Sequence, residues 1–222
     1  LGPARGLAEE QKTEPVFHID FSRYEPEKGT VRQWLSDEGF AFERDAADED
    51  EIMLRFEDDL LHVRTEAPAF GLIHHEEDVK NVSRIRIRWG VSDFPEGASY
   101  ERHVDNEALM VYVFFGHQEL PSGSLFIPDS PYFIGLFLCD RDRVERPYKG
   151  NYYHDGGRFV CLGHPEPGQL VTSEFDLAES FTSFFDKQRV PAISGMSLEV
   201  DTSKSADHGH AAAFIQRIEF LE

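Results

Sequence analysis

Three arginines at alternate positions are the residues whose type and spacing most clearly suggest chemistry. Arg84, Arg86 and Arg88 lie in the run Ser83–Val91 (SRIRIRWGV), where polar and apolar residues alternate strictly. Successive side chains of a β-strand point to opposite faces, so the three guanidinium groups share one face and the apolar residues between them share the other. Guanidinium groups bind carboxylate, sulfate and phosphate groups through paired hydrogen bonds. The stripe therefore predicts either ion pairs within the protein or a site for an anionic ligand.

Each interpretation of the arginine stripe involves further residues. As a cross-strand ladder, the stripe would pair with carboxylates such as Glu199, Asp201 or Glu219. As a binding site on the concave sheet, one of these arginines would hold a uronate, sulfate or phosphate. Tyr112 lies on the face of its strand opposite the apolar residues and would place a sugar-stacking ring beside the arginine. The predicted ligand-binding residues are thus Arg84, Arg86, Arg88, Tyr112 and Asp201.

Potential metal ligands occur in two polar segments. His208 and His210 form a His-x-His pair, which places both imidazoles on one face of an extended segment and can hold zinc, nickel or copper. The hard oxygens that calcium prefers are offered by Asp105, Asn106, Asp201 and Asp207. We expect either no cofactor or a structural calcium ion that ties a loop to a sheet, and not a transition metal. The alternative for these acids is that they are solvated turn residues.

Motifs for catalysis are incomplete. Jelly-roll glycosidases need two carboxylates at a fixed separation across a cleft. Glu199-Val200-Asp201 is suggestive, but it lacks the second glutamate of their strand motif. Arg64-Thr65-Glu66 and the segment 148–152 are similar to pieces of alginate-lyase motifs, without the central Gln-x-His. The sequence therefore favours a non-catalytic binding module, and a polysaccharide lyase or glycoside hydrolase is the alternative.

The elements that must position these residues are short strands. From Val16 onwards, apolar or alternating runs are separated by acidic or Gly/Pro turns, which indicates a sandwich or barrel. We predict one all-β domain over residues 16–222, a two-layer antiparallel jelly-roll sandwich with one or two short helices. The expected strands are Val16–Phe21, Phe40–Arg44, Ile52–Phe56, Leu61–Thr65, Ala69–His74, Ser83–Val91, Leu109–Phe115, Phe133–Cys139, Phe159–Leu162, Leu170–Phe175, Ile193–Val200 and Ala211–Phe220.

Two helices and one cysteine pair complete the expected framework. Thr30–Ser36 precedes Gly39, and Asp176–Lys187 begins with a capping-box spacing from Asp176 to Glu179. Cys139 and Cys161 lie in neighbouring apolar runs. If those runs pair antiparallel, the two thiols face each other and form one bridge; the alternative is a pair of buried free thiols.

Four stretches in the second half of the chain resemble an uncharacterised bacterial family of exported jelly-roll domains. They are Ile87–Val91 (IRWGV), Asp105–Phe115 (DNEALMVYVFF), the helix at Phe175–Phe185, and the closing strands Val190–Thr202 and Ala211–Phe220. The resemblance covers roughly residues 80–222. It implies a carbohydrate-binding-like sandwich and a periplasmic or extracellular location, but no accepted substrate.

The charge balance limits the possible partners. The chain carries 42 acidic and 22 basic residues, for a formal net charge of −20. That charge opposes binding to nucleic acid or to an anionic membrane surface, and no apolar run is long enough for a transmembrane segment. The excess of acidic residues either keeps the protein surface hydrated and soluble or attracts a basic partner. We expect a carbohydrate or anionic small ligand, or a protein partner in an envelope complex that the N-terminal arm, residues 1–15, helps to hold.

Overall fold

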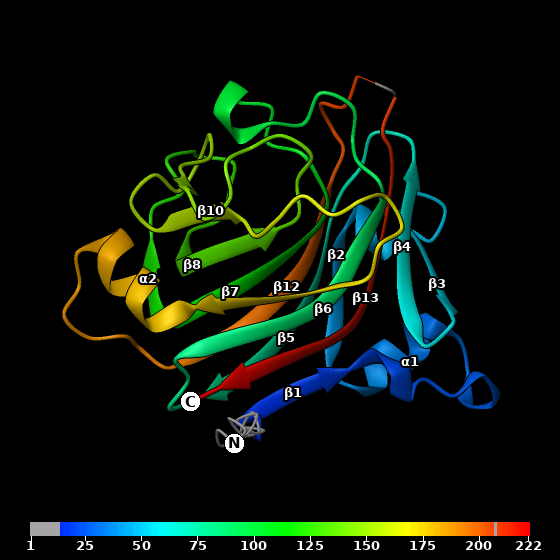
Figure 1. Cartoon of the computed structure of the whole chain (residues 1–222), viewed down its shortest axis with the longest axis horizontal. Helices are drawn as coiled ribbons and strands as arrows, with labels where there is room; N and C mark the ends of the chain where they lie inside the picture. Colours follow the sequence, from blue (N-terminus) through cyan, green and yellow to red (C-terminus); the bar gives the residue numbers. More distant parts are fainter. Residues whose placement is uncertain (1–13, 207) are drawn as a thin grey trace, which may run out of the picture.

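Two β-sheets packed face to face form the structure, a computed structural model that describes residues 14–206 and 208–222 (Figure 1). The predicted arm at residues 1–15 lies almost wholly outside the described residues, and so does Asp207. Sheet A contains, in spatial order, β11 (Val171–Asp176), β6 (Arg84–Asp93), β13 (His210–Leu221), β4 (Leu60–Glu66) and β3 (Met53–Glu57), with β1 (Phe17–Asp20) also paired to β13.

Sheet B supplies the second layer. Its order is β2 (Phe40–Arg44), β5 (Phe70–Val79), β12 (Ile193–Asp201), β7 (Glu107–Leu120), β8 (Ser130–Phe137), β10 (Gly157–Cys161) and β9 (Pro147–Tyr148). The strand pairs are antiparallel, except that β10 runs parallel to β8. The predicted all-β, two-layer sandwich is confirmed.

The alternation of polar and apolar residues determines which face of each strand enters the core. On β6, Ile85, Ile87 and Trp89 are each at most 1% exposed, while the arginines between them face outwards. On β7, Val111 and Val113 point inwards from sheet B in the same way. Because each buried aliphatic side chain contributes about 1.5–3 kcal/mol, this shared core accounts for the register of both sheets.

A second apolar layer covers the outer face of sheet B. It contains Tyr100 and Tyr148 from two long connections, packed on side chains of the sheet such as Met110, Phe133 and Phe159. We call residues 94–106 and 138–156, which contribute these two tyrosines, the loop cover. Strands β7, β8 and β10 are therefore buried on both faces, which is why their sequences are almost continuously apolar.

Two short α-helices match the sequence expectations. Helix α1 (Val31–Asp37) is capped by Thr30, and α2 (Leu177–Phe185) is capped by Asp176, whose carboxylate accepts from the Glu179 amide at 2.7 Å. Helix α2 lies at one end of the sandwich, at the left of Figure 1, where Phe181 packs on Phe115 of β7. Among the described residues, no helix has the length and apolar character that crossing a membrane requires.

The cysteines are bridged. Cys139 and Cys161 form a disulfide with their Cα atoms 5.9 Å apart. The antiparallel pairing that was the condition for a bridge at the level of the sequence is not found, because Phe137 of β8 pairs in parallel register with Cys161 of β10. Cys139 lies just beyond the end of β8 and reaches across to Cys161 from there, so the bridge forms despite the parallel pairing.

Candidate functional site

The arginine stripe lies on the outer, solvent-facing side of sheet A. Arg86 donates to Glu174 of β11 at 2.6 Å and lies 3.5 Å from Glu219 of β13. Arg84 lies 3.8 Å from Glu174. Two of the three arginines therefore take part in a cross-strand ladder. Glu219 was an expected partner, whereas Glu174 comes from a strand whose position beside β6 the sequence did not reveal.

Arg88 differs from the other two arginines. Its cross-strand neighbours are Thr172 on β11 and Arg217 on β13, so neither offers a carboxylate. Like charges directly opposite one another are unfavourable. The Arg217 guanidinium is paired with Asp20 and with Glu219, but Arg88 makes no hydrogen bond or ion pair with any residue that the structure describes. The free guanidinium is thus held beside another cation and remains open to a ligand.

A β-bulge brings additional polar groups next to Arg88. The register between β13 and β6 shifts between Ile215 and Arg217, and Gln216 and Arg217 both reach the outer face there. The result is an open depression of about 360 Å³, which we call the sheet A depression. Its lining residues are Asp20, Ser22, Asp59, Arg86, Arg88, Thr172, Gln216, Arg217 and Glu219.

The electrostatics of the depression keep Arg217 occupied. Burial acts to raise the pKa of Asp20, but hydrogen bonds from Ser22 and Arg217 and the nearby positive charge outweigh it, so the pKa is lowered. Asp20 is therefore ionised at neutral pH and remains paired with Arg217. Three carboxylates and three guanidinium groups line the depression. Arg88 is the one guanidinium among them without a carboxylate partner in the described residues, so the positive charge that a ligand could meet is that of Arg88.

Tyr112 does not lie beside the arginines, contrary to the expectation. It belongs to sheet B, is 8% exposed, and donates its hydroxyl to Glu199 at 2.8 Å. Strands β6 and β7 are consecutive in sequence, but the connection between them crosses from one sheet to the other. For the same reason Glu199 and Asp201, on β12, lie in sheet B and cannot pair with the stripe.

Sheet B contains a buried acidic pair that the sequence did not reveal. Glu107 is 2% exposed and Glu199 is 6% exposed, and their carboxyl groups share a hydrogen bond. Tyr100 of the loop cover donates to Glu107 at 2.9 Å, as Tyr112 does to Glu199. The only signal for Glu107 in the sequence was its place in the acidic segment Asp105-Asn106-Glu107 before an apolar strand.

Burial determines the protonation of this pair. It raises the pKa of Glu107 well above its usual range and the pKa of Glu199 to about 7, and the nearby charge of Asp201 adds to both. A carboxyl pair in hydrogen-bonding contact is too close for glycoside hydrolysis, which needs about 5–9.5 Å between the groups. Beneath the loop cover, burial therefore favours the protonated form of both carboxyl groups.

The predicted calcium ligands come together in part. The Asn106 amide donates to Asp201 Oδ1 at 2.8 Å, and Asn151 donates to Asp105 Oδ2 at 2.6 Å. Asp105 Oδ1 is buried and has no hydrogen-bond partner among the described residues. Burial raises the pKa of both Asp105 and Asp201, and the charge of Lys204 acts against that rise.

The two histidines do not join this cluster. The ring of His210 lies 3.0 Å from Glu66 and 3.5 Å from Asp93, on sheet A. His208 is exposed with a positive φ of 63°, and Asp207 lies outside the described residues. A transition-metal site on a His-x-His face is therefore not formed, because the backbone at His208 is left-handed instead of extended.

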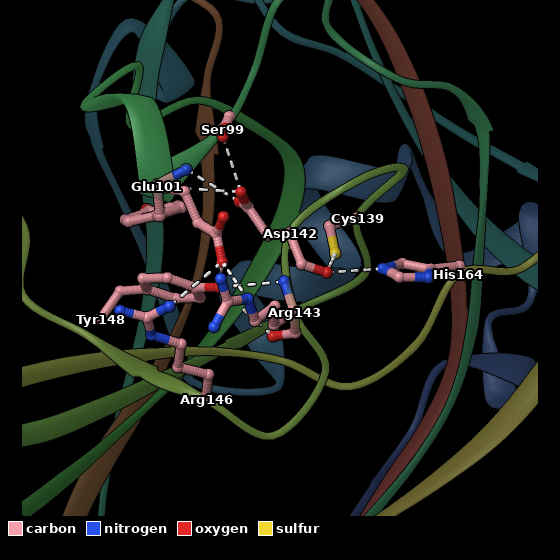
Figure 2. A network of polar contacts seen from close by, with 9 residues as sticks. Ser99, Glu101, Cys139, Asp142, Arg143, Arg146, Tyr148 and His164 are labelled. Atoms are coloured by element: carbon pink, nitrogen blue, oxygen red, sulfur yellow. Dashed lines mark hydrogen bonds and ion pairs between the residues drawn. The ribbon is translucent and has the colours of Figure 1, made fainter.

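A buried carboxylate fixes the loop cover in place (Figure 2). Asp142, 2% exposed, accepts hydrogen bonds from the Ser99 hydroxyl at 2.7 Å and the Tyr100 amide at 2.8 Å. Beside it, Glu101 accepts from Tyr148 at 2.8 Å and lies 3.2 Å from Arg143. These contacts join the two segments of the cover to each other above sheet B.

Comparisons with known proteins give structural neighbours alone. No family model matches the chain, and no curated protein matches it. The potassium-bound carbohydrate recognition domain of Emp46p aligns with a TM-score of 0.45 at 11% identity, over 95% of this chain and 98% of that chain. Its metal-free form gives 0.44 at 12% identity over the same shares.

A further neighbour is the xyloglucanase domain of NopAA, a type three effector from Sinorhizobium fredii, in complex with cellobiose. It aligns with a TM-score of 0.40 at 11% identity, over 81% of this chain and 92% of that chain. Similarity at this level establishes neither a shared ligand nor a shared site.

Proposed function

We propose that the protein is a non-catalytic, exported binding module whose sheet A depression holds an acidic carbohydrate. One observation carries the proposal: Arg88 is exposed and unpaired, beside the occupied cation Arg217. Of the three arginines that line the depression, Arg86 and Arg217 are paired with carboxylates, and Arg88 alone has no carboxylate partner among the described residues. An acidic group of a ligand would supply the missing partner through paired hydrogen bonds.

The rest of the depression suits a polyhydroxylated molecule. The hydroxyls of Ser22 and Thr172 and the amide of Gln216 offer both donors and acceptors, and Asp59 offers a further acceptor. The three guanidinium groups of the lining, Arg88 included, are matched in number by three carboxylates, so one acidic substituent on the ligand fits better than several. A uronic acid within an oligosaccharide meets these requirements. No aromatic residue lines the depression, so polar contacts would provide the binding.

Location and family membership are part of the same proposal. A disulfide such as Cys139–Cys161 forms and persists in oxidising compartments, which supports a periplasmic or extracellular site. The resemblance to an exported jelly-roll family, which covers β6, β7 and the closing strands, stays a prediction in line with that location.

Isothermal titration calorimetry with tri-galacturonate and with a neutral galactose trimer tests the ligand proposal. We expect the acidic trimer to bind and Arg88→Gln to weaken its binding at least tenfold, because hydrogen bonds to charged groups contribute about 1.5–3 kcal/mol. Arg55→Gln is the matched control, since Arg55 is exposed on β3 of the same sheet, outside the depression, and is likewise without a partner among the described residues. Equal loss in both variants, or equal binding of the two trimers, would contradict the proposal.

A second candidate function is an accessory subunit of a larger envelope complex. The loop cover favours it, because the protein's own side chains occupy the outer face of β7, β8 and β10. Deleting residues 1–15 is the corresponding test. We expect the truncated protein to keep its melting temperature and to lose assembly with its partner, whereas unfolding of the truncated protein would argue against this role.

We also propose that Asp105, Asn106 and Asp201 hold a structural calcium ion. The buried, unpartnered Asp105 Oδ1 is the observation that favours it, because a hard cation would satisfy that oxygen. Calcium at 100 times its dissociation constant should stabilise the fold by about 2.7 kcal/mol. Calorimetric melting with CaCl₂ and with EGTA measures this. Asp105→Asn should abolish the difference, and an unchanged difference would place the ion elsewhere.

A further inference from the structure

Two large apolar side chains stand almost fully in solvent at the tip of one loop. Leu125 is 98% exposed and Phe126 is 93% exposed. Among the other large apolar residues that the structure describes, the most exposed is Tyr152, at 47%. Residues 121–129, which join β7 to β8 and which we call the tip loop, therefore differ from the rest of the surface. Adjacent apolar residues held in water mark a contact site more often than single ones do.

Hydrogen bonds from inside the loop hold these side chains outwards. The Ser122 hydroxyl, 1% exposed, lies 2.7 Å from the Ile127 carbonyl and 3.0 Å from the Ser124 carbonyl. The Phe126 amide donates to the Ser124 hydroxyl at 3.1 Å. The loop is also anchored to its neighbour, because the Tyr153 amide donates to the Ser122 carbonyl at 2.9 Å. The tip is thus preorganised, which lowers the entropy cost of docking.

The charged residues around the tip loop indicate which kind of binding surface can accept Leu125 and Phe126. No lysine or arginine occurs between residues 116 and 140, whereas Glu119, Asp129 and Asp155 are all exposed. Asp155 lies two residues beyond Tyr153, which contacts the loop directly. A membrane-inserting tip is usually accompanied by cations that attract lipid headgroups. The exposed acids beside the tip and the net charge of −20 disfavour an anionic bilayer.

We propose that the tip loop is a docking element that inserts Leu125 and Phe126 into an apolar pocket, rimmed by basic residues, on a partner protein. The convex tip requires a concave acceptor, and the acidic surroundings require positive charge at its rim. Side chains that are fully desolvated in a well-packed pocket at the centre of a contact carry most of its binding energy. This surface is separate from the sheet A depression, so the proposal does not depend on the ligand proposed there.

Site-specific photo-cross-linking tests the proposal. The full chain with benzoyl-phenylalanine at position 126 is incubated with an envelope extract of the source organism, irradiated, and mapped by mass spectrometry. We expect one partner protein, cross-linked within an apolar pocket flanked by lysine or arginine. Retention of that partner on the immobilised protein should fall at least tenfold for Leu125→Ser/Phe126→Ser and should weaken as salt is raised.

Two further variants distinguish specific docking of the tip loop from nonspecific adhesion of exposed apolar residues. Val144→Ser removes an apolar residue that is 43% exposed elsewhere on the surface and should leave retention unchanged. Ser122→Ala releases the loop without removing the tip and should reduce retention by a smaller factor than the double variant. Cross-links to lipid, to a second copy of this chain, to a partner surface without basic residues, or to nothing at all would overturn the proposal. Tip-dependent binding to phosphatidylcholine vesicles would do so as well.

Discussion

The burial of the acidic pair Glu107 and Glu199 makes the free energy of unfolding depend on pH. Glu107 and Glu199 have pKa values raised above those of the unfolded chain, so the folded protein binds their protons more tightly. Their stabilising contribution is complete below the unfolded value of about 4.3 and is lost as pH rises towards the folded values. For Glu199 the window therefore runs from about 4.3 up to a pKa of about 7.

Glu199→Gln isolates this contribution. We expect the free energy of unfolding of the native protein to fall through that window by about 1.4 kcal/mol per pH unit for each proton involved. The glutamine variant keeps an amide oxygen that accepts from Tyr112 and from the Glu107 carboxyl group, and it should show a shallower fall. Urea unfolding at a series of pH values measures both curves. If the two curves run parallel from pH 4.5 to 7, Glu199 does not carry the proton.

At the scale of elements, the buried carboxylate of Asp142 is one of the groups that join the two segments of the loop cover. Asp142→Asn should destabilise the protein by about 1–3 kcal/mol, because the new amide group would face the donors that the carboxylate accepts from. Chemical denaturation measures the loss, and hydrogen exchange over residues 94–106 should rise with it. Asp140→Asn, at an exposed neighbour, is the control. A comparable loss in that control would mean that the cover is not held by Asp142.

Most of the elements were predictable, but their spatial neighbours were not. Alternation revealed β6 and its outward arginines, and capping residues revealed both helices, because these signals are local. The parallel pairing of β10 with β8, the short β9 and the loop cover depend on long connections without periodicity. The same limit applies to the site. Alternation placed Arg88 on the outer face with the other two arginines of the stripe, and the family resemblance matches an arginine at Arg88, whereas its neighbours Thr172 and Arg217 depend on strand order. The adjacent polar pair Gln216-Arg217 was the one local sign of the bulge.

At the scale of the whole molecule, the net charge of −20 works against compaction. We expect the melting temperature to rise with ionic strength, because salt screens repulsion between surface carboxylates over about 10 Å at 0.1 M. Calorimetry in sodium chloride and in choline chloride measures the effect. The two salts should stabilise equally, and a rise with sodium alone would indicate a specific ion instead of screening.

The order of strands in space affects when the protein can fold during its synthesis. β12 and β13 are the last strands in the sequence, yet each lies between two others in the middle of its sheet, and β13 also pairs with β1 through Phe17 and Phe220. A nascent chain leaving the ribosome therefore has gaps in both sheets until β12 and β13 emerge. Pairings between residues so distant in sequence form slowly. If the chain is exported as proposed, the same delay would keep it extended long enough to pass through a translocation channel before it folds.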